Sequence, residues 1–520
     1  MANYTPIIGL EIHLELKTAS KMFCGCSNDP EAVLPNTNVC PVCLAHPGSL
    51  PVPNAKAIVG AIKIAHALGC TINTVSKFDR KNYFYPDLPK GYQISQYDQP
   101  IGEHGKLILE FIPGKNTRSE AVIGITRVHL EEDTGKLQHL PNGETAVDFN
   151  RAGVPLVEIV SDPDIQSGAE AKAYCQELRL IFRTLGVSDA DMEKGQMRCE
   201  VNISLQTEGA FIIESGVVKP LSGQVLNPKV EVKNINSFRA VEKAVEFEIT
   251  RQTVLLNAGT PWQQETRGWS DEGGGKTTHQ RYKETAADYR YFPEPDIPPF
   301  HPAELDEPLP ELPQAKRRRF NTEYGFSVAD AELLAADPAW ANYTEAVMSE
   351  LVEWLHDLPE SKSSTTEIQE NKKQQLARLA GGWLTSKLTG AMAERSIHIR
   401  ILKLKPENFA ELIALIFTNR VNSTNAQKIL LEMLDSGVDM DPTHLMEEKG
   451  YGQVSDATQL GAVVLDVMKN YPAQVAQFKA GKEPIIKFLM GMAMKSTEGS
   501  ADPVVVERLL REQLAKPIND

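Results

Sequence analysis

The proline-dense stretch from Phe292 to Pro313 constrains the fold of this chain more than any other feature of the sequence. Proline has no backbone N–H and fixes φ, so neither a helix nor an interior strand continues through such a stretch. Before it, apolar and polar residues alternate in runs such as 6–16, 120–130 and 197–205, which predicts strands. After it, apolar residues recur at spacings of three and four, which predicts helices.

The length and these patterns together predict the domain organisation. A chain of 520 residues is long enough for about three domains. We expect an α+β domain over residues 1–292, in which helices near 54–68 and 169–185 interrupt a largely antiparallel sheet. An all-α domain is expected over 293–405, and an all-α tail of short amphipathic helices over 406–520.

Composition and charge exclude several classes of protein. The chain is 42% hydrophobic and 24% charged, which is typical of globular proteins and excludes disorder. Its net charge of −15 argues against a generally basic surface, so any contact with RNA must come from local patches. No stretch reaches the roughly 18 apolar residues of a membrane helix, and the N-terminus lacks the features of a signal peptide. We therefore expect a cytoplasmic protein.

Four of the seven cysteines lie close together, in two pairs. Two thiol pairs at such spacing are typical of a tetrahedral Zn²⁺ site, and an odd total of cysteines argues against a disulfide framework. Because a site of four sulfur ligands leaves no position for a substrate, a structural Zn²⁺ is favoured over a catalytic one. The alternative is four surface cysteines without a ligand. The predicted ligands are Cys24, Cys26, Cys40 and Cys43.

A first acidic pattern lies in the N-terminal strand. Alternation places Glu11, His13 and Glu15 on one face of residues 9–16 and the leucines and isoleucine on the other. Carboxylates flanking an imidazole suit Mg²⁺ or Mn²⁺ and phosphate chemistry. The alternative interpretation is a polar strand face in contact with water.

Further carboxylates occur at the ends of later strands. Glu158 shares a face with apolar residues, so it needs a metal, a proton or a cation as partner, and an arginine ion pair would serve equally. Alternation places Glu131 beside His129 and Glu132 on the opposite face, and it does not decide between the two. Glu200 lies on a polar face, where the alternative is a surface salt bridge.

A loop over residues 77–90 interleaves cations with aromatic residues, among them Lys81 and Tyr83. Such a loop can hold phosphates and stack on a base, and the alternative is a solvated cationic loop. The stretch 273–278 looks like a phosphate-binding loop, but Ser270 stands where that motif requires glycine, so we reject this interpretation.

Several long motifs occur along the chain. They are IGLEIHLELK at 8–17, SKFDRKNYFYPD at 76–87, YQISQYDQPI at 92–101, HLEEDTGK at 129–136, KNINSF at 233–238, DYRYFPEPD at 288–296 and FLMGMAMK at 488–495. These motifs resemble the B subunit family of bacterial and organellar aspartyl/glutamyl-tRNA amidotransferases. The resemblance runs from end to end, and the tail motif is similar to the tRNA-binding module of that family.

The resemblance implies both a fold and a working complex. The expected fold is a cradle-like catalytic domain related to glutamine synthetase and guanidino kinases, followed by a helical domain and a tRNA-binding tail. In that family an A subunit releases ammonia from glutamine, and a small C subunit supports the pair. The B subunit uses ATP to activate misacylated Glu-tRNA(Gln) or Asp-tRNA(Asn) and amidates it. The implied ligands are ATP, Mg²⁺ or Mn²⁺, and a structural Zn²⁺.

The resemblance also implies roles for individual residues. It favours Glu132 over Glu131 and implies that Lys81, with Tyr83, gates the exit of an ammonia channel by pairing with Glu132. The family commonly has Asp where this chain has Glu200, which lowers the expectation for that residue. The implied metal-centred site comprises Glu11, His13, Glu132, Glu158 and Glu200, and the candidate nucleotide-binding residues are Lys233, Asn234 and Asn236.

Three functions follow as hypotheses. The first is ATP-dependent transamidation of a misacylated tRNA, with ammonia from a partner glutaminase. The second is a non-catalytic tRNA-binding scaffold, supported by the departure at Glu200. The third is a free-standing ligase that acts on small amino acids, against which the long helical tail argues. The sequence does not decide which charged tRNA is the substrate.

Overall fold

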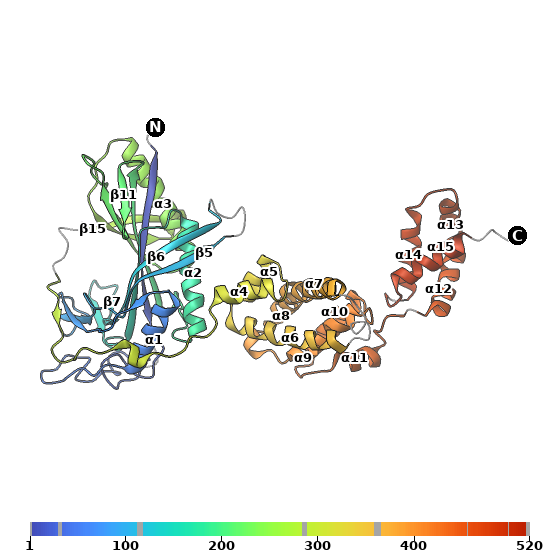
Figure 1. Cartoon of the computed structure of the whole chain (residues 1–520), viewed down its shortest axis with the longest axis horizontal. Coiled ribbons are helices and arrows are strands. Elements are labelled where there is room, and N and C mark those ends of the chain that lie inside the picture. Colours follow the sequence, from blue (N-terminus) through green and yellow to red (C-terminus); the bar gives the residue numbers. More distant parts are fainter. Residues whose placement is uncertain are drawn as a thin grey trace. The chain divides into compact units, whose positions relative to one another are not determined.

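The computed structural model describes residues 3–29, 34–111, 118–282, 289–357, 366–454, 456–497 and 499–515. The chain divides into two compact units, Met1–Pro313 and Gln314–Asp520. The first unit holds the sheets and the second consists of helices in its described part (Figure 1). This mixed architecture agrees with the predicted α+β class. The predicted cradle and its likeness to glutamine synthetase remain predictions.

A nine-stranded sheet forms the framework of the first unit, in the order β15-β14-β13-β10-β1-β9-β6-β5-β2. All neighbouring strands are antiparallel except β13 and β14. The N-terminal strand β1 therefore lies in the middle of the sheet. The strands are β1 (Tyr4–Glu15), β2 (Thr71–Ile72), β5 (Gly102–Glu110), β6 (Glu120–Glu132), β9 (Pro155–Ser161), β10 (Met197–Thr207), β13 (Val230–Ile235), β14 (Glu265–Ser270) and β15 (Lys276–Tyr282).

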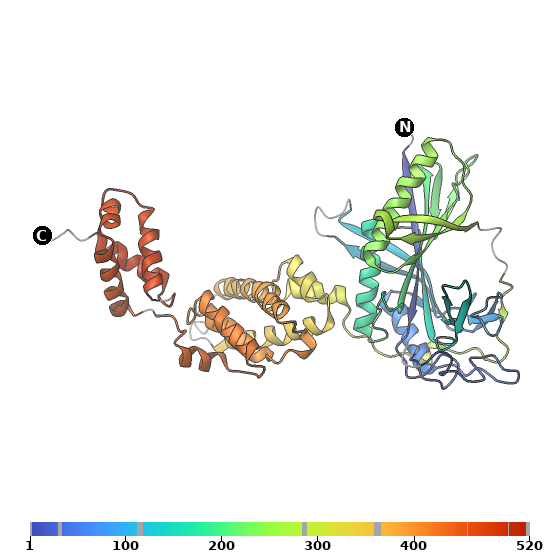
Figure 2. The same cartoon turned by 180° about the vertical axis from the view of Figure 1, so that it is seen from behind.

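Three helices cover one face of this sheet, and both views show α2 and α3 along the same side of the long central strands (Figure 1, Figure 2). They are α1 (Ala55–Ala67), α2 (Gly168–Leu185) and α3 (Phe238–Asn257). Side chains of Asn54, Ser167 and Ser237 accept hydrogen bonds from the first backbone N–H groups and so fix where each helix begins. The apolar face of β1 packs against these helices, and its polar face is turned the other way.

Smaller sheets complete the first unit. Strand β3 (Asp79–Asn82) pairs with β4 (Tyr92–Ser95) and with β16 (Phe292–Pro293), and β4 packs against β6. Two hairpins join β7 (Lys136–His139) to β8 (Thr145–Asp148) and β11 (Phe211–Glu214) to β12 (Val217–Pro220).

The proline-dense stretch stays with the first unit. We expected a boundary after residue 292, but β16 pairs with β3, and Ile297, Phe300 and Leu312 pack against the core of the first unit. A short 3-10 helix, Pro302–Leu305, lies within the stretch. Proline interrupts regular structure here without ending the packed unit, because apolar residues between the prolines still find partners in the core.

The second unit contains two separate hydrophobic cores. The first core draws on residues between Phe320 and Met446 and the second on residues between Leu460 and Leu514. Residues on both sides of the expected boundary near 405, such as Leu384 and Phe409, share the first of these cores. No described helix is long and apolar enough to cross a membrane.

The α-helices of the second unit range from α8 (Thr389–Glu394), with 6 residues, to α6 (Pro338–Asp357), with 20. A π-helical turn (Trp383–Leu388) and a 3-10 turn (Ile399–Ile401) lie among them. The α-helices are α4 (Pro313–Thr322), α5 (Val328–Leu334), α6 (Pro338–Asp357), α7 (Thr366–Gly382), α8 (Thr389–Glu394), α9 (Pro406–Phe417), α10 (Ser423–Asp435), α11 (Pro442–Lys449), α12 (Ala457–Asn470), α13 (Pro472–Lys479), α14 (Ile485–Ser496) and α15 (Pro503–Leu514).

Candidate active site

The polar face of β1 carries the candidate site, because strand register brings acidic residues from three neighbouring strands onto it. Glu11 lies opposite Glu200 of β10, and His13 lies opposite Glu158 of β9. Glu158 in turn lies opposite His129 of β6. Side chains directly opposite each other in an antiparallel pair share a face, so these residues meet on the face that the helices leave uncovered.

The first acidic cluster consists of His13, Glu131 and Glu158. Their ligand atoms all lie within 4.8 Å of one another. The His13 Nε2 atom is 3.4 Å from Glu158 Oε2 and 3.6 Å from Glu131 Oε1. His129 Nε2 is 3.3 Å from Glu158 Oε2. Both carboxylates are buried, and burial of a carboxylate requires a compensating proton, cation or metal. The donor set of oxygen with one nitrogen fits Mg²⁺ or Mn²⁺.

The second acidic cluster consists of Glu11, Glu200 and Glu231, again with ligand atoms within 4.8 Å of one another. Lys233 Nζ is 2.8 Å from Glu200 Oε2 and 3.7 Å from Glu231 Oε1. Asn202 Nδ2 donates a hydrogen bond to Glu11 Oε1 over 3.0 Å. Three carboxylates beside one lysine leave negative charge that a divalent cation would neutralise.

The pKa values in the two clusters reflect this crowding. Burial raises the pKa of Glu11, and the nearby charges of Glu158 and Glu200 raise it further. Burial lowers the pKa of His13, but the Glu158 and Glu131 carboxylates outweigh it and bring that pKa to about 9. Without a metal, the His13 imidazolium thus supplies positive charge to the first cluster, and a bound cation would replace it.

Glu132 lies apart from both clusters. Its carboxylate pairs with Lys90 Nζ, 2.7 Å from Oε1, and accepts a hydrogen bond from the backbone N–H of Ile94 over 3.0 Å. Together with Cys24 and Cys43 it lines a cavity of about 260 Å³. Alternation along β6 explains the difference, because neighbouring residues of a strand point to opposite faces. The structure places Glu131, and not Glu132, in a potential metal cluster, and Glu132 pairs with Lys90 rather than with Lys81.

Lys81 and Tyr83 lie beside a row of tyrosines. Lys81 Nζ is 5.2 Å from the centroid of the Tyr289 ring, which also contacts Tyr83 edge-on at 6.1 Å between centroids. Tyr289 contacts Tyr291, and Tyr291 stacks on Tyr97 with centroids 4.3 Å apart. Burial lowers the pKa of Lys81, but the nearby acidic groups, with Glu131 first among them, together outweigh burial, so the pKa is raised. Lys81 therefore lies within electrostatic reach of the first cluster.

The three candidate nucleotide-binding residues do not lie in one site. Lys233 contacts the second cluster through Glu200. Asn234 is exposed, with a left-handed φ of 64°, and its amide donates a 3.5 Å hydrogen bond to the Trp269 carbonyl. Asn236 is exposed beyond the end of β13. Of the three, only Lys233 joins the acidic site.

The four predicted zinc ligands come together. The sulfur atoms of Cys24, Cys26, Cys40 and Cys43 all lie within 4.8 Å of one another. A hydrogen bond from the Cys24 thiol lowers the pKa of Cys43 to about 5, and the Lys21 ammonium also favours the thiolate. Four converging thiols fit a tetrahedral Zn²⁺.

Sequence reasoning did not assign three of the residues that form or contact the clusters. Glu231 of the second cluster was not assigned, nor was His129, which contacts the first cluster, and the resemblance favoured Glu132 over Glu131. Alternation of Glu231 with Lys233 on β13 gives the face of that strand, but the pattern of a single strand does not say which strand lies beside it.

Comparison with known proteins places this sheet and its acidic face in a family. The first unit is of the class of the GatB/GatE catalytic domain, since the family model of that domain matches residues 6–305. A second family model, of a GatB domain, matches residues 366–514. The chain belongs to the family of B subunits of the aspartyl/glutamyl-tRNA(Asn/Gln) amidotransferase.

Three relatives illustrate how far the similarity extends. The chain is 42% identical over 523 residues to the B subunit of the aspartyl/glutamyl-tRNA(Asn/Gln) amidotransferase from Crocosphaera subtropica, covering 98% of both chains. It is 43% identical over 522 residues to the protein of that name from Thermosynechococcus vestitus, covering 98% of this chain and 96% of the relative. For the one from Persephonella marina the identity is 43% over 516 residues, covering 98% and 99%.

Proposed function

We propose that this chain is the subunit of an aspartyl/glutamyl-tRNA amidotransferase that phosphorylates and then amidates the side-chain carboxyl of Glu-tRNA(Gln), Asp-tRNA(Asn) or both. The proposal rests on one observation: two acidic clusters meet on one face of β1 in a chain whose relatives carry that name. Its expected partners are a glutaminase A subunit, a small C subunit and the charged tRNA, in the cytoplasm.

The chemistry explains why acidic clusters are needed. A carboxylate is a poor acyl electrophile, so one of its oxygens first attacks the γ-phosphorus of ATP, ADP leaves, and ammonia then displaces phosphate from the acyl carbon. The residues that would hold Mg²⁺ are His13, Glu131 and Glu158 in one cluster and Glu11, Glu200 and Glu231 in the other. When bound, the cations supply positive charge beside the phosphate oxygens.

The chain's own residues serve both steps. The three helices cover the back of the sheet, and buried strand residues hold the carboxylates of the clusters in place, which limits water near the reacting groups. We assign the ammonia step to the region of Glu132, Lys81 and Tyr83. The buried Glu132 carboxylate would take a proton from ammonium and Lys90 would hold it in position. The tyrosines offer a partly apolar approach, which favours neutral ammonia.

A structural Zn²⁺ at the four cysteines completes the proposal. The loops that carry these thiols also line the cavity beside Glu132. We therefore assign the zinc to holding the loop that encloses Glu132, and no chemical step to the metal itself.

The test is ADP formation by the reconstituted three-subunit complex, with and without Glu-tRNA(Gln) or Asp-tRNA(Asn). Stimulation by one charged tRNA, lost in Glu158→Gln and kept in Glu242→Gln, is the expected result. Glu242 is the matched control because it pairs with Lys172 on the helical side, away from the clusters. Transfer of ¹⁸O from the labelled side-chain carboxyl into phosphate identifies the acyl phosphate.

Two results would contradict the proposal. If charged tRNA binds but stimulates no ADP formation, the chain is a tRNA-binding scaffold, and Glu200→Asp is then the first variant to make. If free glutamate or aspartate replaces the charged tRNA, the chain is a ligase for small amino acids.

A further inference from the structure

One arginine on the site face has no partner in the described part of the chain. Arg127 lies on β6, two residues before His129 and four before Glu131. Its Nε atom is buried and makes no hydrogen bond, and no ion pair or hydrogen bond of its guanidinium is found among the described residues. An arginine Nε is rarely left in this state, because a buried N–H donor without an acceptor has lost its contact with water.

A β-bulge directs this side chain to the site. Ile125 lies opposite Ser161 of β9 and Arg127 lies opposite Val160, so Thr126 is an extra residue in β6. Ile125 and Val128 both point into the helix-covered core, which leaves Arg127 on the other face. Bulges often re-aim a side chain beside an active site.

The bulge also sets the distance of Arg127 from the acidic clusters. Val160 lies opposite both Arg127 on β6 and Glu11 on β1. Two strand spacings therefore separate Arg127 from Glu11, which is about 10 Å between backbones. Arg127 therefore starts two strands away from Glu11 on the site face, and its long side chain can extend along that face.

Other arginines of the first unit form ion pairs with buried carboxylates, whereas no such pair of Arg127 is found among the described residues. Arg198 binds the buried Asp133 carboxylate, and Arg80 holds Glu294 through both of its donor positions at 2.8 Å. Arg127 lies close to the first cluster and pairs with none of its carboxylates within 4.0 Å in the described structure. The carboxylates turn to His13 and His129 instead, so the donors of Arg127 are available to a ligand.

Tyr291 marks the other side of the same space. Burial raises the pKa of Tyr291 to about 12, and the charges of Glu131 and Glu158 add to this, while those of Lys81 and Arg127 oppose it. Lys81 and Tyr291 both contact the ring of Tyr289, and Arg127 lies on the site face of β6. A site with an arginine, a lysine and a phenol suits a multiply charged oxyanion.

We infer that Arg127 binds the phosphoryl group while it passes from ATP to the side-chain carboxylate of the charged tRNA. The inference rests on the proposed function and deepens it. The new bond joins a carboxylate oxygen to the γ-phosphorus, and the bond from that phosphorus to the β,γ-bridging oxygen breaks and leaves ADP. Negative charge spreads over three phosphoryl oxygens during the transfer, and a planar guanidinium can donate to two of them at once.

Arg127 is placed for this role rather than for binding adenine or the tRNA backbone. It lies in line with Glu11 across the sheet and two residues from His129, whose ring contacts Glu158 of the first cluster. In phosphoryl transfer the cations and the arginine surround the same oxygens, so they need a common centre.

The first experiment measures ADP formation by the full complex with charged tRNA, for wild type, Arg127→Gln and Arg127→Lys. We expect kcat to fall about 100-fold in Arg127→Gln and about tenfold in Arg127→Lys, with KM for tRNA unchanged. Arg183→Gln is the matched control, because Arg183 lies on α2 and donates to the Asp189 carbonyl, on the helical side.

Two readouts separate direct contact from a structural role. Guanidinium ion added to Arg127→Ala should raise the rate of that variant at least tenfold. ADP with aluminium fluoride mimics the phosphoryl group in transfer. This complex should bind about 100-fold more weakly to Arg127→Gln than to wild type, while ADP alone should bind both equally. Unchanged kcat, an effect on KM for tRNA alone, or equal binding of the fluoride complex would overturn the inference. If Arg127→Gln does not assemble into the three-subunit complex, binding of ADP with aluminium fluoride to Arg127→Lys tests the same point.

The proposed function fails separately. If the wild-type complex transfers no ¹⁸O from the carboxyl to phosphate, that function is wrong whatever Arg127 does. If the wild type transfers ¹⁸O and Arg127→Gln does so at the same rate, only the inference about Arg127 is wrong.

Discussion

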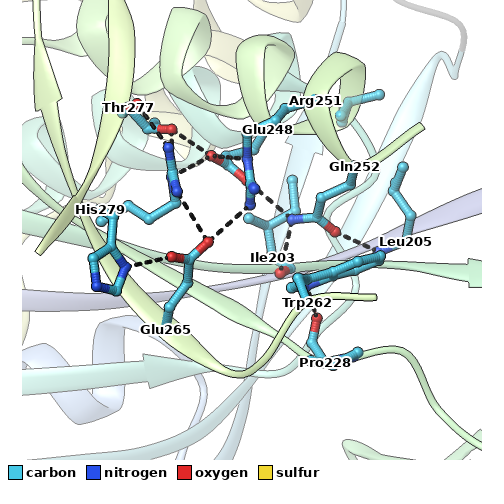
Figure 3. A network of polar contacts seen from close by, with 12 residues as sticks. Ile203, Leu205, Pro228, Glu248, Arg251, Gln252, Trp262, Glu265, Thr277 and His279 are labelled. Atoms are coloured by element: carbon cyan, nitrogen blue, oxygen red, sulfur yellow. Dashed lines mark hydrogen bonds and ion pairs between the residues drawn. The ribbon is translucent and has the colours of Figure 1, made fainter. Parts of the chain in front are cut away.

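Two regions of the same sheet bury carboxylates, and they treat them differently. At one edge, α3, β14 and β15 surround Glu248 and Glu265, as Figure 3 shows. Arg251 binds Glu248 at 2.8 Å and lies 3.4 Å from Glu265, while Arg267 is 3.3 Å from Glu248 and 3.0 Å from Glu265. His279 Nδ1 adds a 2.6 Å contact to Glu265. Each carboxylate in this network therefore meets two arginines.

The acidic clusters on β1 lack that balance. Glu131 and Glu158 lie in one cluster and Glu11, Glu200 and Glu231 in the other, and among the described residues the lysine that forms ion pairs with them is Lys233. The edge network satisfies its charges within the chain, so it stabilises the fold without a ligand. The clusters leave negative charge for a cation to neutralise, and this excess of carboxylates indicates that they bind a cation.

The largest expected effect distinguishes the neighbouring residues Glu131 and Glu132. Glu131→Gln removes a carboxylate from the first cluster, so ADP formation with charged tRNA should fall roughly 1,000-fold, or about 4 kcal/mol of transition-state stabilisation. Glu132→Gln should keep ADP formation but lower the yield of amidated tRNA from glutamine. Both ADP and amidated tRNA are measured for each variant. If Glu132→Gln lost ADP formation and Glu131→Gln kept it, Glu132 rather than Glu131 would belong to the metal site.

The second prediction breaks the edge network. Arg251→Met removes one cation from buried Glu248 and Glu265, and should lower the free energy of unfolding of the first unit by about 3 kcal/mol. Hydrogen exchange of peptides over β13 and β14, measured in the full chain, reports the change. ADP formation by the folded protein should stay at the wild-type level. Glu158→Gln should show the opposite pattern, losing activity while exchange in β13 and β14 is unchanged.

The third prediction uses the cation itself. Mg²⁺ or Mn²⁺ at 100 times its dissociation constant should stabilise the first unit by about 2.7 kcal/mol, because a ligand of the folded state shifts unfolding by mass action. Thermal unfolding with and without the metal measures the shift. Glu11→Gln should reduce it and Arg251→Met should leave it intact. A shift of equal size in both variants would mean that the metal binds elsewhere.

The smallest predicted effect is a pH dependence of the edge network. Burial raises the pKa of Glu265, but the hydrogen bond from His279 and the charge of Arg267 outweigh it, so the pKa is lowered from 4.5. A lowered folded-state pKa contributes stability that is complete above the unfolded pKa and is lost as pH falls through the folded one. The difference in unfolding free energy between wild type and Glu265→Gln should be constant from pH 7 to 5.5 and shrink below 4.5. A constant difference down to pH 4 would show that the ionised carboxylate adds nothing.

The sequence predicted local features of the site better than its assembly. Alternation alone placed Glu11 and His13 on one polar face, and the inward position of Glu158 followed from its apolar neighbours. The choice between Glu131 and Glu132 needed the strand beside them, because only pairing of β6 with β9 shows which residue faces His13. Glu231 and Arg127 were missed for a related reason. Pairing across strands and a bulge in β6 are set by contacts between distant segments, and no pattern within one strand records them.

The central position of β1 has a consequence for how the protein folds. Strand β1 precedes both of its partners, β9 on one side and β10 on the other, so Glu11 meets Glu200 only when the chain has been made as far as β10. Such non-local pairing makes folding slow, because long loops must close before any contact rewards them. During synthesis, β1, which carries Glu11 and His13, therefore emerges before the segments that pair with it and cover its apolar face. A nascent chain stopped before β10 therefore holds four of the six candidate metal ligands and lacks Glu200 and Glu231, so the second cluster cannot yet form.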